Sequence, residues 1–266
     1  MIATATRILR QRQLLAVMTA RELKARYRGS MLGFLWSLAN PLLLLGVYTF
    51  VFGLVFQPRV AGQSPYPVFL VAGLFPWVWV SSSVNEATAS LTANASLIRR
   101  SVFPVELLPL VPVLSNLVNF LLSVPILVGA LLVARVLGYP VGGTWIVLLP
   151  LVVALHLPFL GGVALALAAL AVHFKDVRDL VSNLLTLVFF LTPILYPVDA
   201  VPNRGLRALV EWNPATPFVL AYQDVLFYGR PPQPVVWLGM AVAAVVAWSI
   251  GSWVFGRLSD TLIEAV

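Results

Sequence analysis

The sequence has 266 residues, of which 60% are hydrophobic and 10% charged, and its mean hydropathy is +0.95. Soluble domains carry about 25% charged residues, so this composition excludes an ordinary soluble domain and indicates a membrane protein. The absence of cysteine excludes disulfides, thiolate metal sites and cysteine nucleophiles. A net charge of +7 would suggest nucleic-acid binding in a soluble chain. In a membrane chain it reports orientation, and we expect no nucleic-acid partner.

Residues 1–30 predict an amphipathic segment at the cytoplasmic surface of the membrane. We do not expect a signal peptide here, because arginines interrupt the segment and it has no continuous apolar core. Apolar side chains can face acyl chains while basic ones meet anionic headgroups. The apolar ones are Ile8, Leu9, Leu15 and Met18, and the basic ones are Arg7, Arg10, Arg12 and Arg21. The capping-box spacing of Thr19 and Glu22 predicts that a second helical stretch restarts there. The alternative is a basic patch that only sets topology.

Uncharged runs divide the rest of the chain into six predicted transmembrane helices, which form a single all-α membrane domain over residues 1–266. A span needs roughly 20 apolar residues. The runs lie at 29–58, 60–85, 107–134, 136–174, 180–198 and 231–256. We place the helices near 34–56, 66–84, 106–134, 144–172, 179–196 and 234–255. The fourth run, of 39 residues, could also hold two short helices split between Gly161 and Gly162.

Loop charge favours six spans with both termini in the cytoplasm. With that topology, 12 of the 17 basic residues lie on inner segments and 5 on outer segments. Positive charge concentrates on the cytoplasmic side of membrane proteins. We therefore expect a multi-pass protein of the cytoplasmic, or inner, membrane.

The segment 85–101, between the second and third predicted spans, has a helical period of its own. Its apolar residues recur at helical spacing, and they are Ala87, Leu91, Ala95 and Ile98. Arg99 and Arg100 close the segment, where basic residues suit the end of a helix. The pattern predicts a short amphipathic cytoplasmic helix that can dock into a groove of a soluble partner. A plain connector is the alternative.

The segment 198–232, before the last predicted span, indicates two short helices at the outer surface. Residues 206–212 allow two helical turns, and Asn213-Pro214 breaks the chain after them. Thr216 before Pro217 starts a second helix, and Gly229 ends it. Its apolar stripe consists of Phe218, Tyr222, Val225 and Leu226. The pair could dip back into the membrane as a lid over a pathway, or could lie at the interface without a gating role.

The chain lacks the motifs of several membrane activities. Its only lysines, Lys24 and Lys175, follow Leu23 and Phe174, so the phosphate loop of ATPases is absent. Neither the zinc-protease motif nor the nucleophile elbow occurs. We therefore expect no catalytic residue, no metal site and no ATP hydrolysis by this chain.

Ion-coupled transport is also disfavoured, because the six runs contain no Asp, Glu, Lys or Arg. Ion sites built from carbonyl groups stay open as an alternative. His156 lies mid-span beside Pro158, where we expect a neutral packing role rather than a proton relay, and His173 lies at the cytoplasmic edge. The sequence thus predicts a chain that moves a cargo with energy from a partner.

Short strings along the chain occur in an order that resembles a known family. Residues 21–30 read RELKARYRGS and are followed by Leu32-Gly33, Leu35-Trp36-Ser37 and Asn40-Pro41. Later strings are Ala72-Gly73-Leu74, Pro76-Trp77, Ser90-Leu91, Asn94, Leu97-Ile98, Phe103-Pro104, Glu106, Leu108-Pro109, Asp176, Arg178-Asp179, Thr192-Pro193, Tyr196-Pro197 and Asn213-Pro214. Together they resemble the permeases of type 2 ABC exporters, and most of all the branch that exports lipid-linked polysaccharide such as O-antigen, capsule or teichoic acid.

The resemblance implies a homodimer of six-span subunits with two copies of a separate cytoplasmic ATPase, which would bind ATP and Mg²⁺. This chain itself would hold no cofactor. The cargo would be a glycan on undecaprenyl diphosphate, and membrane lipids would be further partners. Aromatic faces suit sugar rings, so some aromatic residues would line its path.

The resemblance also implies roles for individual residues. Residues that couple to the ATPase would be Leu91, Asn94, Leu97, Ile98, Arg99, Arg100, Asp176 and Arg178. The diphosphate would meet a cytoplasmic gate at Arg26, Tyr27 and Arg28. The glycan path would include Trp36, Tyr48 and Trp77. The outer gate would include Trp212, Phe218 and Tyr222.

Three other interpretations stay open at this stage. A permease of the same type could move a small amphiphile, such as a drug or a glycolipid without a polymer. A membrane enzyme acting on lipid-linked sugars would need a carboxylate at a membrane face, and its candidates are Glu106, Asp176, Asp179 and Asp224. A passive channel would leave the docking helix at 85–101 unexplained.

Overall fold

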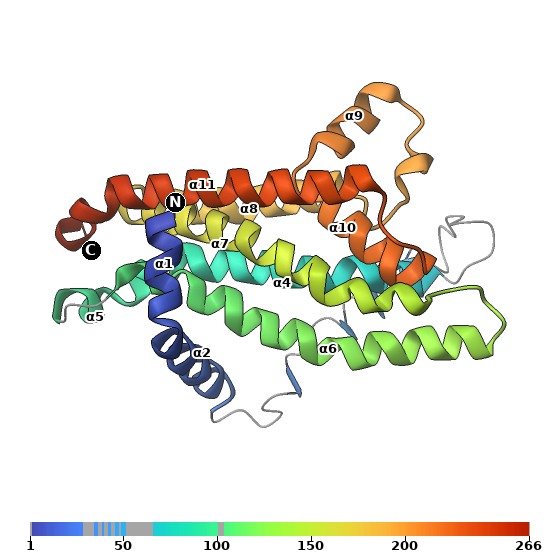
Figure 1. The fold of residues 1–266 in the computed structure, drawn as a ribbon, viewed down its shortest axis with the longest axis horizontal. Coiled ribbons are helices and arrows are strands. Elements are labelled where there is room, and N and C mark those ends of the chain that lie inside the picture. The colour runs from blue at the N-terminus through green and yellow to red at the C-terminus, as the bar shows by residue number, and fades with distance from the viewer. Residues whose placement is uncertain are drawn as a thin grey trace.

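The computed structural model describes residues 2–28, isolated positions between 35 and 51, and residues 66–100 and 104–265. Every regular element within these residues is a helix. The first predicted span, near 34–56, lies mostly outside them, and so does Tyr48. The described helices form an elongated bundle, and the labelled N- and C-terminal ends lie toward the same end of it (Figure 1).

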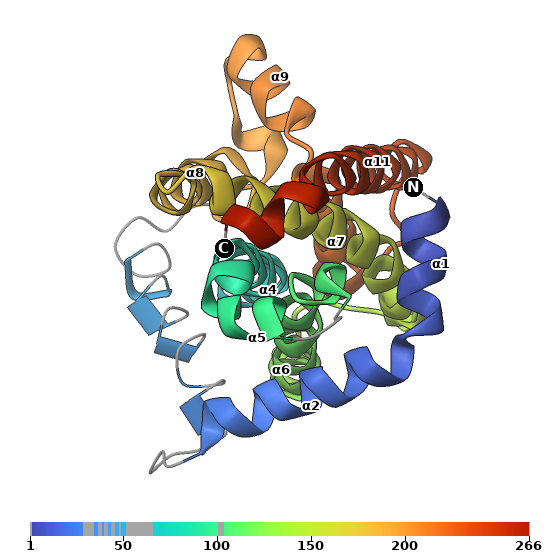
Figure 2. The ribbon, with the colours of Figure 1, turned by 90° about the vertical axis from the view of Figure 1, so that its left-hand side faces the viewer.

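Two helices at the N-terminus lie across one end of the bundle. They are α1 (Ile2–Arg10) and α2 (Arg12–Tyr27), and they meet at a corner around the other helices (Figure 2). The chain bends at Gln11, so the helix restart predicted at Thr19 is wrong. Instead α2 runs through Thr19, whose hydroxyl donates to the Leu15 carbonyl 2.8 Å away. Leu15 is buried against protein rather than left for lipid.

Four of the described helices are long and apolar enough to cross a membrane. They are α4 (Tyr66–Ala93), α6 (Leu110–Val136) with the 3-10 turn η3 (Val105–Leu107), α7 (Leu149–His173) with the 3-10 turn η4 (Thr144–Leu148), and α11 (Pro234–Ala265). They correspond to the second, third, fourth and sixth predicted spans. Helix α7 continues through Gly161 and Gly162, so the fourth run does not split there.

The fifth predicted span, near 179–196, is a shorter helix than expected. Helix α8 (Val177–Leu191) has 15 residues, and at about 1.5 Å per residue it covers about 22 Å of the roughly 30 Å hydrocarbon core. It ends because Pro193 follows: a residue before proline avoids helical angles, and Thr192 is extended with ψ 137°. The helix alone is therefore shorter than the hydrocarbon core.

The segment before α11 forms the two helices expected from the sequence, with additional turns. It contains η5 (Val198–Ala200), α9 (Arg204–Trp212), α10 (Thr216–Gln223) and the π-helical turn η6 (Asp224–Tyr228). The Asn203 side chain caps α9 by accepting from two backbone N–H groups, and Gly229 at φ +62° ends η6. Helix α10 packs inside the bundle, whereas α9 stands out from it (Figure 1).

A close helix crossing joins α7 and α11 through glycines. A side chain added at Gly162 would meet the backbone of Ala247, and one added at Gly251 would meet the carbonyl of Gly162. Glycine at both positions therefore lets the two backbones touch, as small residues do between helices in membranes. This crossing holds α11 against the core of the bundle.

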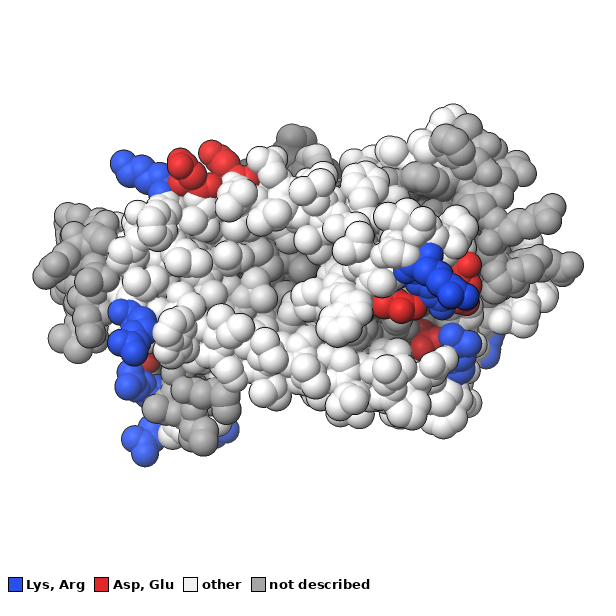
Figure 3. Space-filling view, turned by 90° about the horizontal axis from the view of Figure 1, so that it is seen from above, with Lys and Arg blue, Asp and Glu red and all other residues white. Residues whose placement is uncertain are grey.

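The surface of the described chain supports a membrane-embedded middle. In Figure 3 the visible charged side chains gather toward the two ends, with uncharged surface between them. Large apolar side chains are exposed along the helices between those ends, among them Leu132, Leu187 and Val245. Together with the four apolar helices, this surface is that of a multi-pass membrane protein.

Candidate functional site at the two ends of the bundle

A charged network ties the N-terminal helix α2 to two long helices. The Arg26 guanidinium donates to the Glu86 carboxylate of α4 at 2.5 Å and to the Asn116 amide oxygen of α6 at 2.8 Å. The Asn116 amide nitrogen donates to the same Glu86 oxygen at 2.9 Å. Three helices far apart in the sequence are thus fixed to one another at a single point. This point lies toward the end of the bundle that holds the labelled chain ends (Figure 1).

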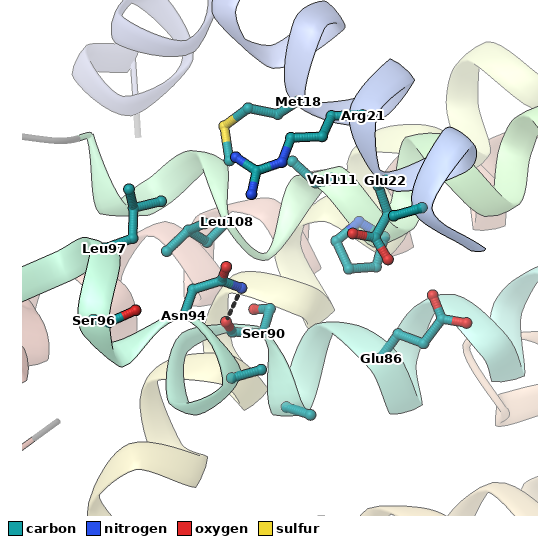
Figure 4. A pocket seen from close by; sticks show the side chains of 14 residues that line it. Met18, Arg21, Glu22, Glu86, Ser90, Asn94, Ser96, Leu97, Leu108 and Val111 are labelled. Carbon is teal, nitrogen blue, oxygen red and sulfur yellow. Dashed lines mark hydrogen bonds between the residues drawn. The ribbon is translucent and has the colours of Figure 1, made fainter. Parts of the chain in front are cut away.

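A groove of about 670 Å³ lies beside this network, between α2 on one side and α4, α6 and the short helix α5 (Ala95–Arg100) on the other. Its apolar lining includes Met18, Leu97, Leu108 and Val111. Arg21 points into it from α2, and Glu22 faces toward Glu86 across it (Figure 4). The groove is therefore amphipathic and carries both signs of charge.

The predicted docking segment 85–101 is divided between two helices. Its first part belongs to α4, which continues to Ala93, and α5 follows after a turn at Asn94. At 28 residues, α4 is about 42 Å long and so extends beyond a hydrocarbon core of about 30 Å. Its last turns and α5 therefore reach out of the membrane-sized middle of the bundle.

The predicted coupling residues do not all face outward. Leu91 and Ile98 are buried in a cluster with Leu15 and Leu107, so they hold the segment onto the bundle. Asn94 and Leu97 line the groove, and the Asn94 side chain donates to the Ser90 carbonyl at 2.8 Å. Among the described side chains at the end of α4 and in α5, the exposed ones are Thr92, Ala93 and Ser96, which sequence reasoning did not select. The side chains of Arg99 and Arg100 lie outside the described residues.

The second predicted contact, the turn before α8, meets the first. The exposed Arg178 donates to the Thr92 hydroxyl at 2.9 Å, which joins the start of α8 to the end of α4. Asp176 is exposed beside it. The two segments predicted to contact a partner thus form one surface, which we call the docking surface: Thr92, Ala93, Ser96, Asp176 and Arg178.

The other residues predicted for the cytoplasmic gate and the glycan path are dispersed. Arg28 is exposed after the end of α2, while the side chain of Tyr27 lies outside the described residues. Trp36 is half exposed. Trp77 is buried, and its ring packs against Phe189 of α8 with 5.8 Å between centroids. The structure does not bring Trp36 and Trp77 together as one described lining.

A buried aromatic cluster holds α4, α6, α7 and α10 together. The His156 ring stacks on Phe218 with 4.3 Å between centroids, and its Nδ1 lies 3.3 Å from the Tyr222 hydroxyl. The Trp79 ring meets His156 edge-on, and its Nε1 donates to the Val113 carbonyl at 3.1 Å. His156 therefore has the hydrogen-bonded packing role that its sequence position predicts.

Of the three predicted outer-gate residues, Phe218 and Tyr222 belong to this cluster and Trp212 does not. Phe218 and Tyr222 are 1% and 0% exposed, so they anchor α10 in the core, whereas Trp212 at the end of α9 is 87% exposed. Of the three, Trp212 alone is exposed on the surface.

The turn after α10 carries an ion pair at the end of the bundle opposite the labelled chain ends (Figure 1). Arg230 donates to the buried Asp224 carboxylate at 2.6 Å and lies over the Tyr228 ring, 4.7 Å from its centroid. Burial raises the pKa of Asp224, and the hydrogen bond and charge of Arg230 act in the opposite direction. Within the part of the chain that the structure describes, groups of three His, Asp or Glu residues that could hold a metal ion are absent.

Comparison with known proteins identifies the family of this chain. The sequence profile of the ABC-2 type transporters matches residues 13–227. This chain belongs to the ABC-2 type transporter family. The matched region includes α2, the docking surface and the aromatic cluster, and it ends within η6.

Curated relatives cover most or all of the chain. An O-antigen export system permease protein, RfbA of Myxococcus xanthus, is 36% identical over 270 residues, which is 100% of both chains. RfbA of Klebsiella pneumoniae is 37% identical over 251 residues and 94% of both chains. The polysialic acid transport protein KpsM of Escherichia coli is 24% identical over 250 residues, covering 92% of this chain and 93% of its own.

Proposed function

We propose that this chain is the membrane subunit of an ABC transporter that exports a lipid-linked polysaccharide of the O-antigen type across the cytoplasmic membrane. The observation that carries the proposal is the similarity to O-antigen export permeases over the full length of the chain. A separate cytoplasmic ATPase binds ATP and Mg²⁺ and supplies the energy. The absence of a phosphate loop in this sequence supports that division of labour.

The working unit in this proposal is a homodimer of six-span subunits with two ATPase copies. The first span lies within 34–56, and α8 completes the fifth with the residues after it. Both termini are cytoplasmic. The position of α5 toward the same end of the bundle as the two labelled chain ends supports this orientation (Figure 1).

The ATPase contacts the docking surface in this proposal, together with Arg99 and Arg100. A push on α5 passes directly into α4, because only the turn at Asn94 separates them. Through Glu86 and Arg26 the same push reaches α2. The network therefore gives one mechanical path from the ATPase contact to the N-terminal segment.

The diphosphate of the lipid carrier meets Arg26 and Arg28 at the cytoplasmic gate. Arg28 is exposed. The two described bonds of Arg26 occupy two of the five N–H donors of a guanidinium, so Arg26 can hold Glu86 and still donate to a phosphate oxygen. Trp36, Tyr48 and Trp77 contribute to the glycan path, and α9 with Trp212 forms the movable part of the outer gate. Phe218 and Tyr222 fix its base.

A gene deletion tests the function. Cells without the chain should lose surface polysaccharide and accumulate lipid-linked glycan in the cytoplasmic leaflet, and a plasmid copy should restore export. The tagged chain should also purify with an ATPase in equal amounts. Normal surface polysaccharide in the deletion strain would contradict the proposal. Loss of a small amphiphile from the medium, with polysaccharide unchanged, would assign a different cargo.

A further inference from the structure

A second cavity, of about 470 Å³, lies at the outer end between η5, α9, α10, η6 and α11. We call it the outer cavity. Its volume is in the range of small-molecule sites, about 300–1,000 Å³. The side chains of Arg207 and Arg230 on its wall are 42% and 55% exposed, so the cavity opens to the surroundings. The roles proposed above for individual residues do not involve the residues that line this cavity.

The charges on its wall are already paired with one another. Arg207 donates to Glu211 at 2.8 Å and to Asp199 at 3.0 Å. Arg230 donates to Asp224 at 2.6 Å. Each carboxylate on the wall therefore faces a guanidinium, which disfavours a bare cation. The wall carries three carboxylates and two guanidinium groups, and this excess of negative charge disfavours a phosphate.

The paired groups keep hydrogen-bonding capacity for a neutral ligand. A carboxylate offers about four lone-pair sites and a guanidinium five N–H donors, and the bonds described here use only some of them. The wall thus offers both donors and acceptors. A hydroxyl group, which both donates and accepts, fits such a wall better than a group that only accepts.

The rest of the wall is apolar or amphipathic. Pro197, Leu220, Val235 and Val236 line the cavity, and Tyr228 adds a ring. A sugar ring has apolar C–H faces and a rim of hydroxyls, so it matches a cavity with both kinds of lining. A lipid chain would leave the ion pairs unused.

We propose that the outer cavity binds a short, uncharged stretch of the exported polysaccharide as it leaves the membrane. The inference rests on the proposed function and adds to it a glycan subsite on the outer side. Binding there holds the emerged part of the chain outside while the next stretch moves.

Photo-crosslinking in living cells tests where the glycan lies. A photoreactive phenylalanine analogue replaces Val235, which lines the cavity and is 67% exposed, or Leu238, which is one turn further along α11 and 64% exposed but does not line it. In cells that export polysaccharide, illumination should attach glycan to the permease at position 235 and not at 238. Equal labelling at both positions, or none at 235, would overturn the inference.

A binding measurement on the purified full chain tests the chemistry. The probe is oligosaccharide released by mild acid from the surface polysaccharide of the same cells. Arg207→Gln should weaken its binding about two- to tenfold, as expected for one lost hydrogen bond, while Arg204→Gln on the same helix should not. Both variants should keep the unfolding temperature of the parent. Unchanged affinity in Arg207→Gln would overturn the inference.

The two proposals fail in different ways. If surface polysaccharide does not depend on this chain, the export function itself is wrong. If export depends on the chain but position 235 does not label, the export function stands and the outer cavity is not a glycan site.

Discussion

Exchanging the charges of Arg26 and Glu86 separates two roles of the network that joins α2, α4 and α6. The pair is held at 2.5 Å and both partners also bond to Asn116. If Arg26 acts only as a clamp, the variant with Arg26→Glu and Glu86→Arg should keep both stability and export. Our account gives Arg26 a second role at the diphosphate, so the exchange should restore stability but not export.

The contribution of the Arg26–Glu86 pair to stability depends on how exposed the two side chains are. The side chains of Arg26 and Glu86 are 26% and 38% exposed, so solvent screens part of their attraction. Pairs in one hydrogen-bonded network couple by about 0.5–3 kcal/mol. For this partly exposed pair we expect the middle of that range, about 1–2 kcal/mol in the free energy of unfolding.

A double-mutant cycle measures this coupling. Arg26→Gln, Glu86→Gln and the double variant are purified in detergent, and their unfolding is compared with that of the parent. Arg12→Gln, an exposed change on the same helix, serves as the control. Additive effects, within about 0.3–0.5 kcal/mol, would refute the clamp. Export that is equally low in Arg26→Gln and Glu86→Gln, and normal in the charge exchange, would refute the diphosphate role.

Three further changes test other parts of the structure. Gly162→Leu should lower the free energy of unfolding by about 1–3 kcal/mol or more, because its side chain would meet the backbone of α11, and it should abolish export. The control Gly256→Leu places its side chain in open space, so this variant should melt like the parent. His156→Phe keeps a ring on Phe218 and loses the hydrogen bond to Tyr222, so it should cost about 1 kcal/mol of stability. Export in cells should be retained. Loss of export at a normal protein level would instead favour a proton relay through His156. Burial raises the pKa of Asp224 in the folded chain above its ordinary value of about 3.9. Between these two pKa values the folded chain binds more protons than the unfolded chain, so the stability falls as the pH rises from one value to the other. Melting curves of Asp224→Asn should lack this fall, and an identical pH profile would show that Asp224 does not titrate there.

Uncharged runs predicted the long helices well, because a span needs an unbroken apolar stretch and charges mark its limits. The same criterion overestimated the length of the fifth helix, since the run 180–198 contains Pro193, and the residue before a proline leaves the helical region. It also missed the length of α4. Glu86 ends the uncharged run but does not end the helix, which continues to Ala93 outside the membrane-sized middle.

The docking surface shows what periodicity cannot decide. The spacing of Leu91 and Ile98 marks an apolar face, but one sequence does not say whether that face meets a partner or the chain itself. In the structure it meets Leu15 and Leu107, and the small polar Thr92 and Ser96 are left outside. Small polar residues opposite an apolar stripe were the signal available in the sequence.

The network at Arg26 had no local signal at all. Glu86 and Asn116 lie 60 and 90 residues away along the chain, so only the folded bundle brings them to α2. The sequence predicted a basic segment near the cytoplasmic gate, but not that its central arginine would be tied to a carboxylate. Contacts of this kind depend on helix packing rather than on residue pattern.

Transport by the reconstituted complex tests the central claim most directly. The chain and its ATPase are placed in liposomes with an oligosaccharide on undecaprenyl diphosphate, and the glycan that becomes protected from an added glycosidase is measured. Our account predicts that protection rises with ATP, and that it fails without this chain or with an ATP analogue that is not hydrolysed. Normal ATP hydrolysis by the complex with no rise in protected glycan would contradict it.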